Sequence, residues 1–213
     1  MLPSDHCSRS LRRARRGSSP AQLLGVLALA AWASAGPVGE EVIRGSVTFQ
    51  RQGDLTLITA SHNSIVNYQS LDIARSETVR FLQPDARSRI LNRITSASPT
   101  QIDGSLLANG RVYLVNPAGV VFGKDSFVNV GALYAAAASI SDSDFLAGID
   151  RFTGAGGPVV NEGRIVAGSV ALLGGRVANY GSIVADKGMV LMAAGDEILL
   201  AERDGHMMVK IQG

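Results

Sequence analysis

A short repeat near the C-terminus constrains the fold of this 213-residue chain more than any other feature. The segment Asn161–Ala167 recurs as Asn179–Ala185, at a spacing of 18 residues, and a second apolar run follows each copy, Val170–Leu173 and then Met189–Met192. A unit of strand, Gly turn and strand is too short to bury its own apolar face, so it must stack on its neighbours. The repeat therefore predicts an all-β solenoid, the parallel β-helix, in which each coil lies on the previous one.

Stacking makes a specific prediction about equivalent residues in successive coils. They should lie about 4.8 Å apart along the axis. Ile165 is expected over Ile183, and Asn161 over Asn179, where asparagine side chains can hydrogen-bond from coil to coil. With roughly 20 residues per coil, residues 36–213 would form about eight or nine coils.

A sandwich of β-hairpins is the alternative fold. Asp103-Gly104, Asn109-Gly110 and Asp204-Gly205 are typical two-residue turns between antiparallel strands. The period of 18 residues favours the β-helix over the sandwich, and hairpins are then expected as additions to the solenoid.

Short strand patterns continue through the rest of the chain. Apolar and polar residues alternate with period two, which sends one set of side chains to a core and the other to solvent. The clearest runs are Gly45–Phe49, Asp54–Thr59, Glu77–Phe81 and Arg111–Val115. With 24 glycines and only 5% aromatic residues, the composition fits many tight turns and thin aliphatic packing.

One segment has the composition of a helix. Ala132–Ala138 is rich in alanine, which has high helix propensity, yet small side chains can also line a narrow solenoid. We expect a strand through about Tyr134 and then a brief helical turn. Ser141–Leu146 has the pattern of a capped turn that opens a short helix.

The first 35 residues have the pattern of a secretory signal peptide. A basic stretch, Arg9–Arg16, precedes the apolar run Leu23–Trp32, and a small-x-small site, Ala33–Ala35, follows. The predicted cleavage lies between Ala35 and Gly36, which leaves residues 36–213 as the exported domain.

The leader has two alternative interpretations. A transmembrane or buried core helix is one, but the apolar run is too short for a permanent membrane anchor. The pair Arg15-Arg16 is compatible with twin-arginine export, although the surrounding residues do not strengthen it. Export with this leader, by the twin-arginine route or by the ordinary secretory route, requires machinery in the inner membrane.

Removing the leader changes the charge and the redox chemistry of the chain. Five arginines, Asp5 and the single cysteine, Cys7, lie within residues 1–35, so 15 basic and 17 acidic side chains remain, a net charge of −2. The basic character of the whole chain therefore belongs to the leader, and no nucleic-acid partner is expected. No disulfide can form in the exported domain.

The sharpest turn signal is Asn116-Pro117-Ala118-Gly119. Asn at the first position, Pro at the second and Gly at the fourth fit a type I β-turn between Val115 and Val120. Pro fixes its own φ, and the Asn side-chain oxygen can accept a hydrogen bond from the backbone. From composition alone this segment is only a turn.

Taken together, these segments resemble the two-partner-secretion domain, the N-terminal module of filamentous haemagglutinin-like exoproteins. The resemblance extends from about Val42 to Val209, and the combined order and spacing make it specific. The segments that carry it are Ile65–Ser70, Glu77–Phe81, Asn109–Gly123, Ile140–Gly148 and Val170–Gly174.

The resemblance implies a right-handed parallel β-helix with extra β elements near its N-terminus. It implies recognition in the periplasm by the soluble domains of a dedicated outer-membrane β-barrel translocator, and a secreted or cell-surface product. The family's turn usually reads Asn-Pro-Asn-Gly; Asn116, Pro117 and Gly119 match it and Ala118 departs. Family members usually carry a long repetitive passenger after this domain, so a chain that stops at Gly213 is expected to be a fragment, a truncated gene product or a short variant.

The same fold also hosts polysaccharide lyases and hydrolases, so a carbohydrate-binding or polysaccharide-degrading protein is the alternative function. The acidic candidates are Asp142, Asp144, Asp150, Asp186 and Asp196. Each lies in a Gly- or Ser-rich segment typical of solvated turns. His62 and His206 fit no metal motif, and Gly154–Pro158 lacks the lysine of a phosphate loop. We expect no catalytic residue, metal or cofactor; adhesion is a third possibility that would belong to a passenger.

Overall fold

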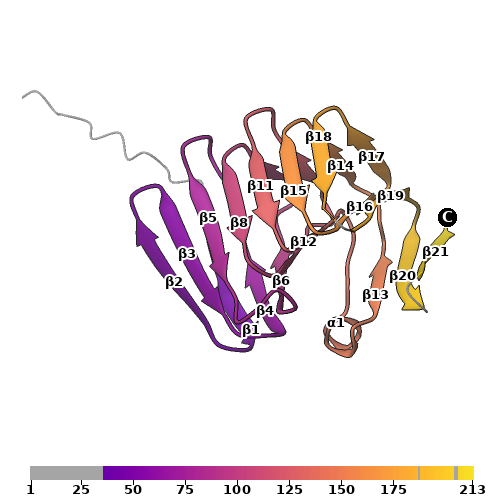
Figure 1. Ribbon diagram of the computed structural model, residues 1–213, viewed down its shortest axis with the longest axis horizontal. Coiled ribbons are helices and arrows are strands. Elements are labelled where there is room, and N and C mark those ends of the chain that lie inside the picture. The colour runs from indigo at the N-terminus through magenta and orange to yellow at the C-terminus, as the bar shows by residue number, and fades with distance from the viewer. Residues whose placement is uncertain (1–35, 187, 204–205) are drawn as a thin grey trace, which may run out of the picture. The chain divides into compact units, whose positions relative to one another are not determined.

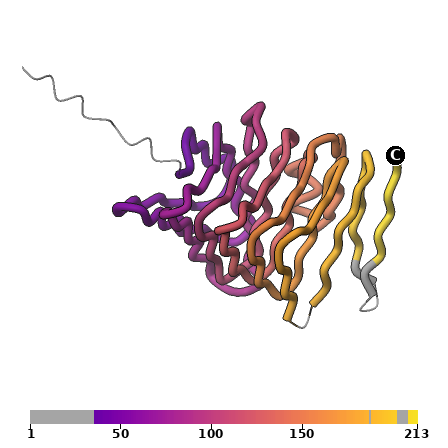
Figure 2. Tube along the Cα trace, turned by 90° about the horizontal axis from the view of Figure 1, so that it is seen from above, coloured from indigo at the N-terminus to yellow at the C-terminus, as the bar shows by residue number. Residues whose placement is uncertain are grey.

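The computed structural model describes residues 36–186, 188–203 and 206–213 (Figure 1). The expected leader, including Ala35, lies outside the described residues, and of the predicted cleavage site only Gly36 is within them. In the described part of the chain the backbone winds into a parallel β-solenoid of about six coils. Seen from above, the coils follow one another along the axis in chain order (Figure 2).

Three sheets run along the solenoid, and we call them sheets I, II and III. Sheet I contains, in spatial order, β1 (Glu41–Arg44), β4 (Ser64–Tyr68), β6 (Arg89–Ile94), β9 (Arg111–Val115), β12 (Ala132–Ala136), β16 (Val170–Gly174) and β19 (Val190–Ala194). Sheet II contains β7 (Thr100–Ile102), β10 (Val120–Phe122), β14 (Pro158–Asn161) and β17 (Arg176–Asn179). Sheet III contains β2 (Val47–Gln52), β3 (Leu55–Ala60), β5 (Thr78–Leu82), β8 (Ser105–Ala108), β11 (Phe127–Val130), β15 (Arg164–Ala167) and β18 (Ser182–Ala185). A complete coil passes through sheet I, sheet II and sheet III in that order.

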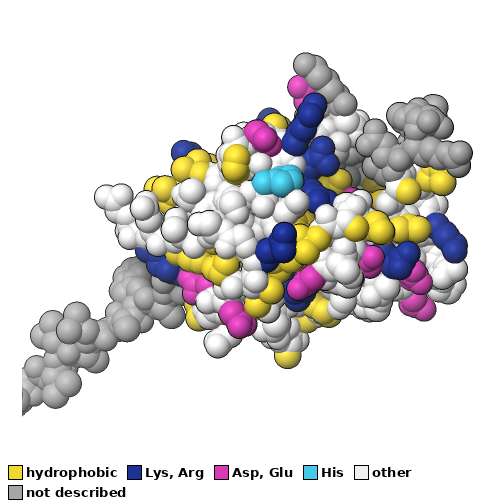
Figure 3. All heavy atoms as spheres, turned by 90° about the horizontal axis from the view of Figure 1, so that it is seen from below, with side chains coloured by type: hydrophobic (Ala, Val, Ile, Leu, Met, Phe, Trp, Pro, Cys, Tyr) yellow, Lys and Arg dark blue, Asp and Glu magenta, His cyan; other side chains and the backbone are white. Residues whose placement is uncertain are grey.

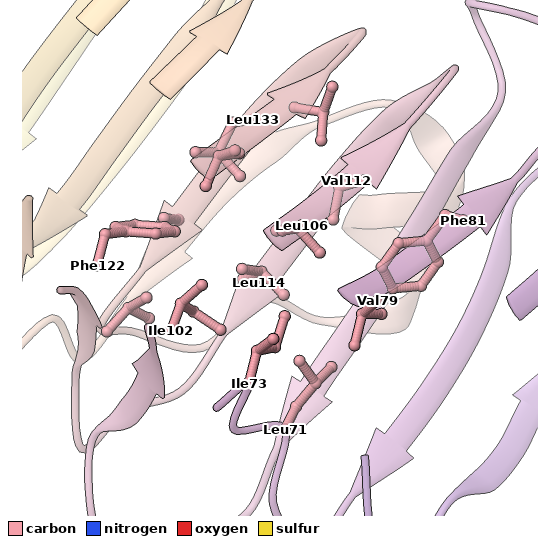
Figure 4. Packing of buried hydrophobic residues seen from close by; sticks show 14 of the residues in the cluster. Leu71, Ile73, Val79, Phe81, Ile102, Leu106, Val112, Leu114, Phe122 and Leu133 are labelled. Atoms are coloured by element: carbon pink, nitrogen blue, oxygen red, sulfur yellow. The ribbon is translucent and has the colours of Figure 1, made fainter. Parts of the chain in front are cut away.

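The interior of the solenoid is a continuous apolar core. Along β9, Val112 and Leu114 point into it, and alternate residues of the other strands do the same. Figure 4 shows how these side chains from several coils pack against one another. Parallel pairing places identical residues of adjacent coils beside one another, since Ile165 pairs with Ile183 and Val166 with Val184. The predicted register between the two copies of the repeat is therefore confirmed.

Antiparallel strands close the N-terminal end. β1 pairs antiparallel with β4 at the edge of sheet I, and β2 pairs antiparallel with β3 at the edge of sheet III. These are the extra β elements that the family resemblance implies near the N-terminus.

A second layer covers the outer face of sheet I. It consists of the short helix α1 (Asp142–Ala147) and a three-stranded antiparallel sheet of β13 (Asp150–Thr153), β20 (Glu197–Arg203) and β21 (His206–Gln212). Phe145, Phe152 and Ile198 of this layer are fully buried in one cluster with Tyr113 and Leu173 of sheet I. The central strands of sheet I are thus buried on both faces.

The coil count predicted from the repeat was too high. Partners in adjacent coils are 18 residues apart at Ile165 and Ile183, but 26 apart at Ser64 and Ile90 and 37 apart at Leu133 and Val170. The longest coil contains α1 and β13, and the antiparallel strands at both ends use further residues. The C-terminal repeat is the shortest coil, so its period did not apply to the whole chain.

The predicted hairpin turns were also wrong in two places. Asp103-Gly104 connects β7 to β8 and Asn109-Gly110 connects β8 to β9, and both are corners of parallel coils. Asp204-Gly205 lies outside the described residues. The N-terminal hairpin instead turns at Gly53, which has a φ of 55° that favours glycine.

The alanine-rich segment is a strand. β12 continues to Ala136, two residues beyond the predicted end at Tyr134, because Ala135 and Ala136 pair with Leu172 and Leu173 of the next coil and are fully buried. The helix begins only at Asp142. Its N-cap is Ser141, whose hydroxyl accepts a hydrogen bond from the Asp144 amide at 3.0 Å, as the sequence predicted.

Candidate recognition site

The Asn116–Gly119 turn lies where the chain passes from sheet I to sheet II. The Gly119 amide donates to the Asn116 carbonyl at 2.9 Å, and the Ala118 amide donates to the Asn116 side-chain oxygen at 2.9 Å. The turn expected from the sequence therefore forms, and the Asn side chain accepts a backbone hydrogen bond within it.

The side chain of Asn116 also connects this turn to the preceding coil. Asn116 is completely buried, and its Nδ2 donates to the Ser98 carbonyl and to Thr100 Oγ1, both at 3.0 Å. The loop between β6 and β7 is thereby held against the turn. Because the Asn116 side chain hydrogen-bonds both within the turn and to the preceding loop, its loss would leave buried polar groups without partners.

The outer side of the turn reaches the surface. Pro117 is exposed and Ala118 is half-buried. Gly119 has a φ of 131°, and a Cβ there would lie 2.8 Å from the Pro158 carbonyl oxygen of the following coil. Gly119 is thus required by both backbone conformation and space, whereas positions 117 and 118 are free to contact a partner.

A hollow of about 460 Å³ adjoins the turn. Its lining residues are Arg93, Ile94, Thr95, Ser96, Ala97, Val115, Pro117, Ala118, Ala138 and Ser139. Arg93 fixes one wall, since its Nη2 donates to the Ile140 carbonyl at 2.9 Å and to Asp142 Oδ1 at 2.7 Å. The turn, the preceding loop and the segment before α1 line this hollow together.

Aromatic and charged side chains connect α1 and β13 to sheet I. Tyr113 and Tyr134 stack with ring centroids 4.2 Å apart and an interplanar angle of 1°, and Phe145 meets Tyr113 edge to face at 5.2 Å. The Arg89 guanidinium lies 5.0 Å from the centre of the Phe145 ring. These contacts hold the second layer in place.

Asp150, at the start of β13 in this layer, is half-buried. Burial raises the pKa of its carboxyl, while the hydrogen bond from Tyr113 and the positive charges of Arg89 and Arg111 act in the opposite direction. Burial also raises the pKa of the Tyr134 hydroxyl. The sequence grouped Asp150 with solvated turn residues; its position at the start of β13, with its carboxyl directed to the Tyr113 hydroxyl of sheet I, is a correction.

The stacked asparagines lie where the repeat placed them. Asn161 is completely buried, and its Nδ2 donates to Asn179 Oδ1 at 2.7 Å. Asn161 Oδ1 also accepts a hydrogen bond from the Gly163 amide at 3.2 Å. The pair therefore joins two coils at the corner between sheets II and III.

The remaining sequence candidates lie apart from the turn. Asp142 pairs with Arg93, and Asp144 lies in the first turn of α1. Asp186 and Asp196 are exposed, and His62 is exposed on the loop between β3 and β4. Across the described ranges no group of three or more His, Cys, Asp or Glu side chains could hold a metal ion. Within the same ranges no helix is both long and apolar enough to span a membrane.

The fold combines a parallel β-solenoid, antiparallel strands at its N-terminal end, an outer α/β layer and a corner turn anchored by Asn116. This is the architecture of an exoprotein secretion module. The family model for the TPS secretion domain matches residues 42–208, so the chain belongs to that family. Such domains engage a cognate outer-membrane translocator, and the chain is part of a secreted or cell-surface protein exported across a Gram-negative envelope.

Individual relatives agree with this assignment. The crystal structure of the HMW1 secretion domain from Haemophilus influenzae matches with a TM-score of 0.79 and 33% sequence identity, covering 84% of this chain and 50% of that one. Two heme/hemopexin-binding proteins from Haemophilus influenzae are 37% and 33% identical over 100 and 101 residues. The chain spans 11% of the length of each of these two relatives.

Proposed function

We propose that this domain is recognised in the periplasm by the soluble domains of its outer-membrane translocator, through the surface around the Asn116–Gly119 turn. The observation that carries the proposal is the contrast within the turn. Asn116 is completely buried and fixes the backbone, while Pro117 is presented to solvent. A turn that is held this firmly can offer a partner one defined shape.

The mature sequence supports passage through a pore before folding. Residues 36–213 contain no cysteine, so no disulfide can lock the chain early. The strands of the solenoid pair mostly with those of adjacent coils, which allows folding coil by coil as the chain emerges. Inner-membrane export guided by residues 1–35 would precede this step.

The exposed surface is compatible with a protein partner. On the face shown in Figure 3, charged side chains of both signs are interspersed with hydrophobic ones. The edge strand β2 also leaves one row of backbone groups outside the sheet, and strand addition there would be a second mode of contact with the translocator.

The proposal concerns secretion and not the activity of a whole exoprotein. The curated relatives are named for binding heme and hemopexin, and this chain spans 11% of their length. We therefore do not extend those ligands to this domain.

Co-expression with the cognate translocator tests the proposal. We expect Pro117→Ala combined with Ala118→Glu to reduce the amount of protein in the medium while the purified variant keeps the wild-type urea midpoint. Ser182→Glu, on an exposed position of β18, is the matched control and should leave export unchanged. Full export of the double variant would remove the turn from the recognition surface, and export without any translocator would remove the function itself.

A further inference from the structure

The layer outside sheet I is built from two segments that are distant in the sequence. The first, α1 with β13, is an insertion within one coil, between β12 and β14. The second is the antiparallel hairpin of β20 and β21, which we call the strap. β20 pairs with β13 and so joins the strap to the first segment (Figure 1). The two segments differ in how they are attached to the solenoid.

Specific contacts anchor α1 and β13 to the coils. The Phe145 ring packs edge to face on Tyr113, and the Tyr113 hydroxyl donates to Asp150. Thr153 exchanges two backbone hydrogen bonds with Ser139, at 2.8 and 2.9 Å. None of these contacts involves a residue of the strap, so α1 and β13 would stay in place without it.

The strap has weaker attachments. Of its described side chains, Ile198 and Leu200 are buried in the cluster between the layers, whereas residues 208–212 of β21 are exposed. The ion pair of Glu197 with Arg151 of β13 is 3.9 Å long, and both side chains are exposed, so it contributes little. Among the residues whose side chains the structure describes, no side-chain hydrogen bond joins the strap to the coils.

This difference allows the strap to open on its own. Elements with few buried apolar contacts open locally at a lower free energy than the core does. Opening would free the edge of β13 that β20 now occupies and uncover the apolar surface around Phe152 and Leu173, which belong to the same cluster as Ile198 and Leu200. Free backbone groups beside an apolar surface can bind an added strand.

β20 shows which kind of segment fits this edge. Ile198 and Leu200 lie two positions apart and are both buried, as alternation along a strand requires. Glu197 precedes them and lies beside Arg151. The edge therefore selects an extended segment with two apolar residues at alternate positions and an acidic residue just before the first of them.

We propose that the strap is releasable and that β13 beneath it accepts such an extended segment from a protein partner. The strap and the partner compete for one edge, so binding is weak while the strap is docked and strong once it is released. This surface is separate from the Asn116–Gly119 turn and from the edge of β2, and it does not depend on translocator recognition.

Hydrogen exchange of the full wild-type chain tests the release. We expect the amides of β20 to exchange at least about tenfold faster than those of β9 and β12, which lie beneath both segments of the layer. Amides of β20 that exchange as slowly as those of β9 would show that the strap opens only when the whole domain unfolds, and would overturn the proposal.

A fluorescent peptide with the sequence of residues 196–203 tests the acceptor edge. The full chain with both Ile198→Asp and Leu200→Asp should have its strap undocked, because burial of the two carboxylates is unfavourable. We expect this double variant to bind the peptide at least about tenfold more tightly than the wild type, in which the docked strap competes. Met208→Asp, at an exposed position of β21, is the matched control and should bind like the wild type.

A second peptide identifies the contacts. It carries serine at the positions that correspond to Ile198 and Leu200, and it should not bind the double variant. Absence of binding of the first peptide to the double variant, equal binding of that peptide to the wild type, or equal binding of both peptides would each overturn the proposal. Because hydrogen exchange uses the wild-type chain, the proposal stays testable if the double variant fails to fold.

Discussion

The Tyr113 hydroxyl donates to Oδ1 of Asp150 over 3.0 Å and so ties a central strand of the solenoid to the layer outside it. Tyr113 belongs to β9 and Asp150 to β13, 37 residues later. Asp150 in turn pairs with Leu200 of β20. This contact therefore links three segments that are distant in the sequence, and it places a half-buried carboxyl between the outer layer and sheet I.

Replacement of Asp150 by Asn should stabilise the domain at neutral pH. The pKa of the Asp150 carboxyl is raised in the folded state, so the fold binds its proton more tightly than the unfolded chain does. The stability of the wild type should therefore fall as pH rises from about 3.9, the ordinary value, through the raised pKa. Asn can still accept the Tyr113 hydrogen bond and carries no charge that partial burial disfavours.

Urea unfolding of both proteins between pH 4 and pH 8 measures this difference. We expect the free energy of unfolding of Asp150→Asn to exceed that of the wild type at pH 8 and the two to converge towards pH 4. A wild type that gains stability relative to Asp150→Asn as pH rises would show that Arg89 and Arg111 outweigh burial.

Asn116→Ala should destabilise the domain far more than Ala118→Asn does. The buried side chain makes two donor hydrogen bonds, to Ser98 and Thr100, and each unsatisfied buried group costs about 1–3 kcal/mol. Ala118→Asn, which restores the usual family motif, alters a half-buried position and should change stability by less than about 0.5 kcal/mol. Urea midpoints compare the two variants, and equal losses would contradict the anchoring role of Asn116.

The sequence predicted the solenoid because its evidence was local and periodic. The pairs Ile165 with Ile183 and Asn161 with Asn179 follow from one repeat, and a parallel coil puts equivalent residues in register. The layer formed by α1, β13 and β20 was missed because its contacts join distant segments that share no period. One signal was present: Arg111–Val115 has apolar residues at four consecutive positions, which is typical of a strand buried on both faces.

The candidate site could be predicted only in part. The Asn-Pro-x-Gly pattern identified a turn, since turn chemistry depends on residues close in sequence. The partners of Asn116, however, lie in the preceding coil, and no spacing in the chain points to Ser98 or Thr100. That the turn contacts a translocator stays a prediction, as does the cleavage between Ala35 and Gly36.

Gly163→Ala should be strongly destabilising, because coils approach closely at this corner. A Cβ at Gly163 would lie 2.5 Å from the Gly123 carbonyl oxygen and against the Ser126 side chain. Backbone on the neighbouring coil cannot move aside, and overpacking of this kind costs about 1–3 kcal/mol or more. Gly156→Ala is the control, since no atom lies within 4 Å of its Cβ. Thermal unfolding should separate the two variants, and a Gly163→Ala protein as stable as Gly156→Ala would show that the coils are packed less tightly.

The two stacked asparagines should differ in importance although they occupy equivalent positions. Asn161 is completely buried, bonds to Asn179, and accepts from the Gly163 amide, whereas Asn179 is exposed in the last parallel coil. Asn161→Ala should therefore cost about 1–3 kcal/mol and Asn179→Ala about 1 kcal/mol or less, because water can replace Asn179 as a partner. Urea unfolding of the single variants and of the double variant measures both costs and their coupling. A double variant with the sum of the two losses would mean that the contact between the side chains contributes nothing beyond each residue alone.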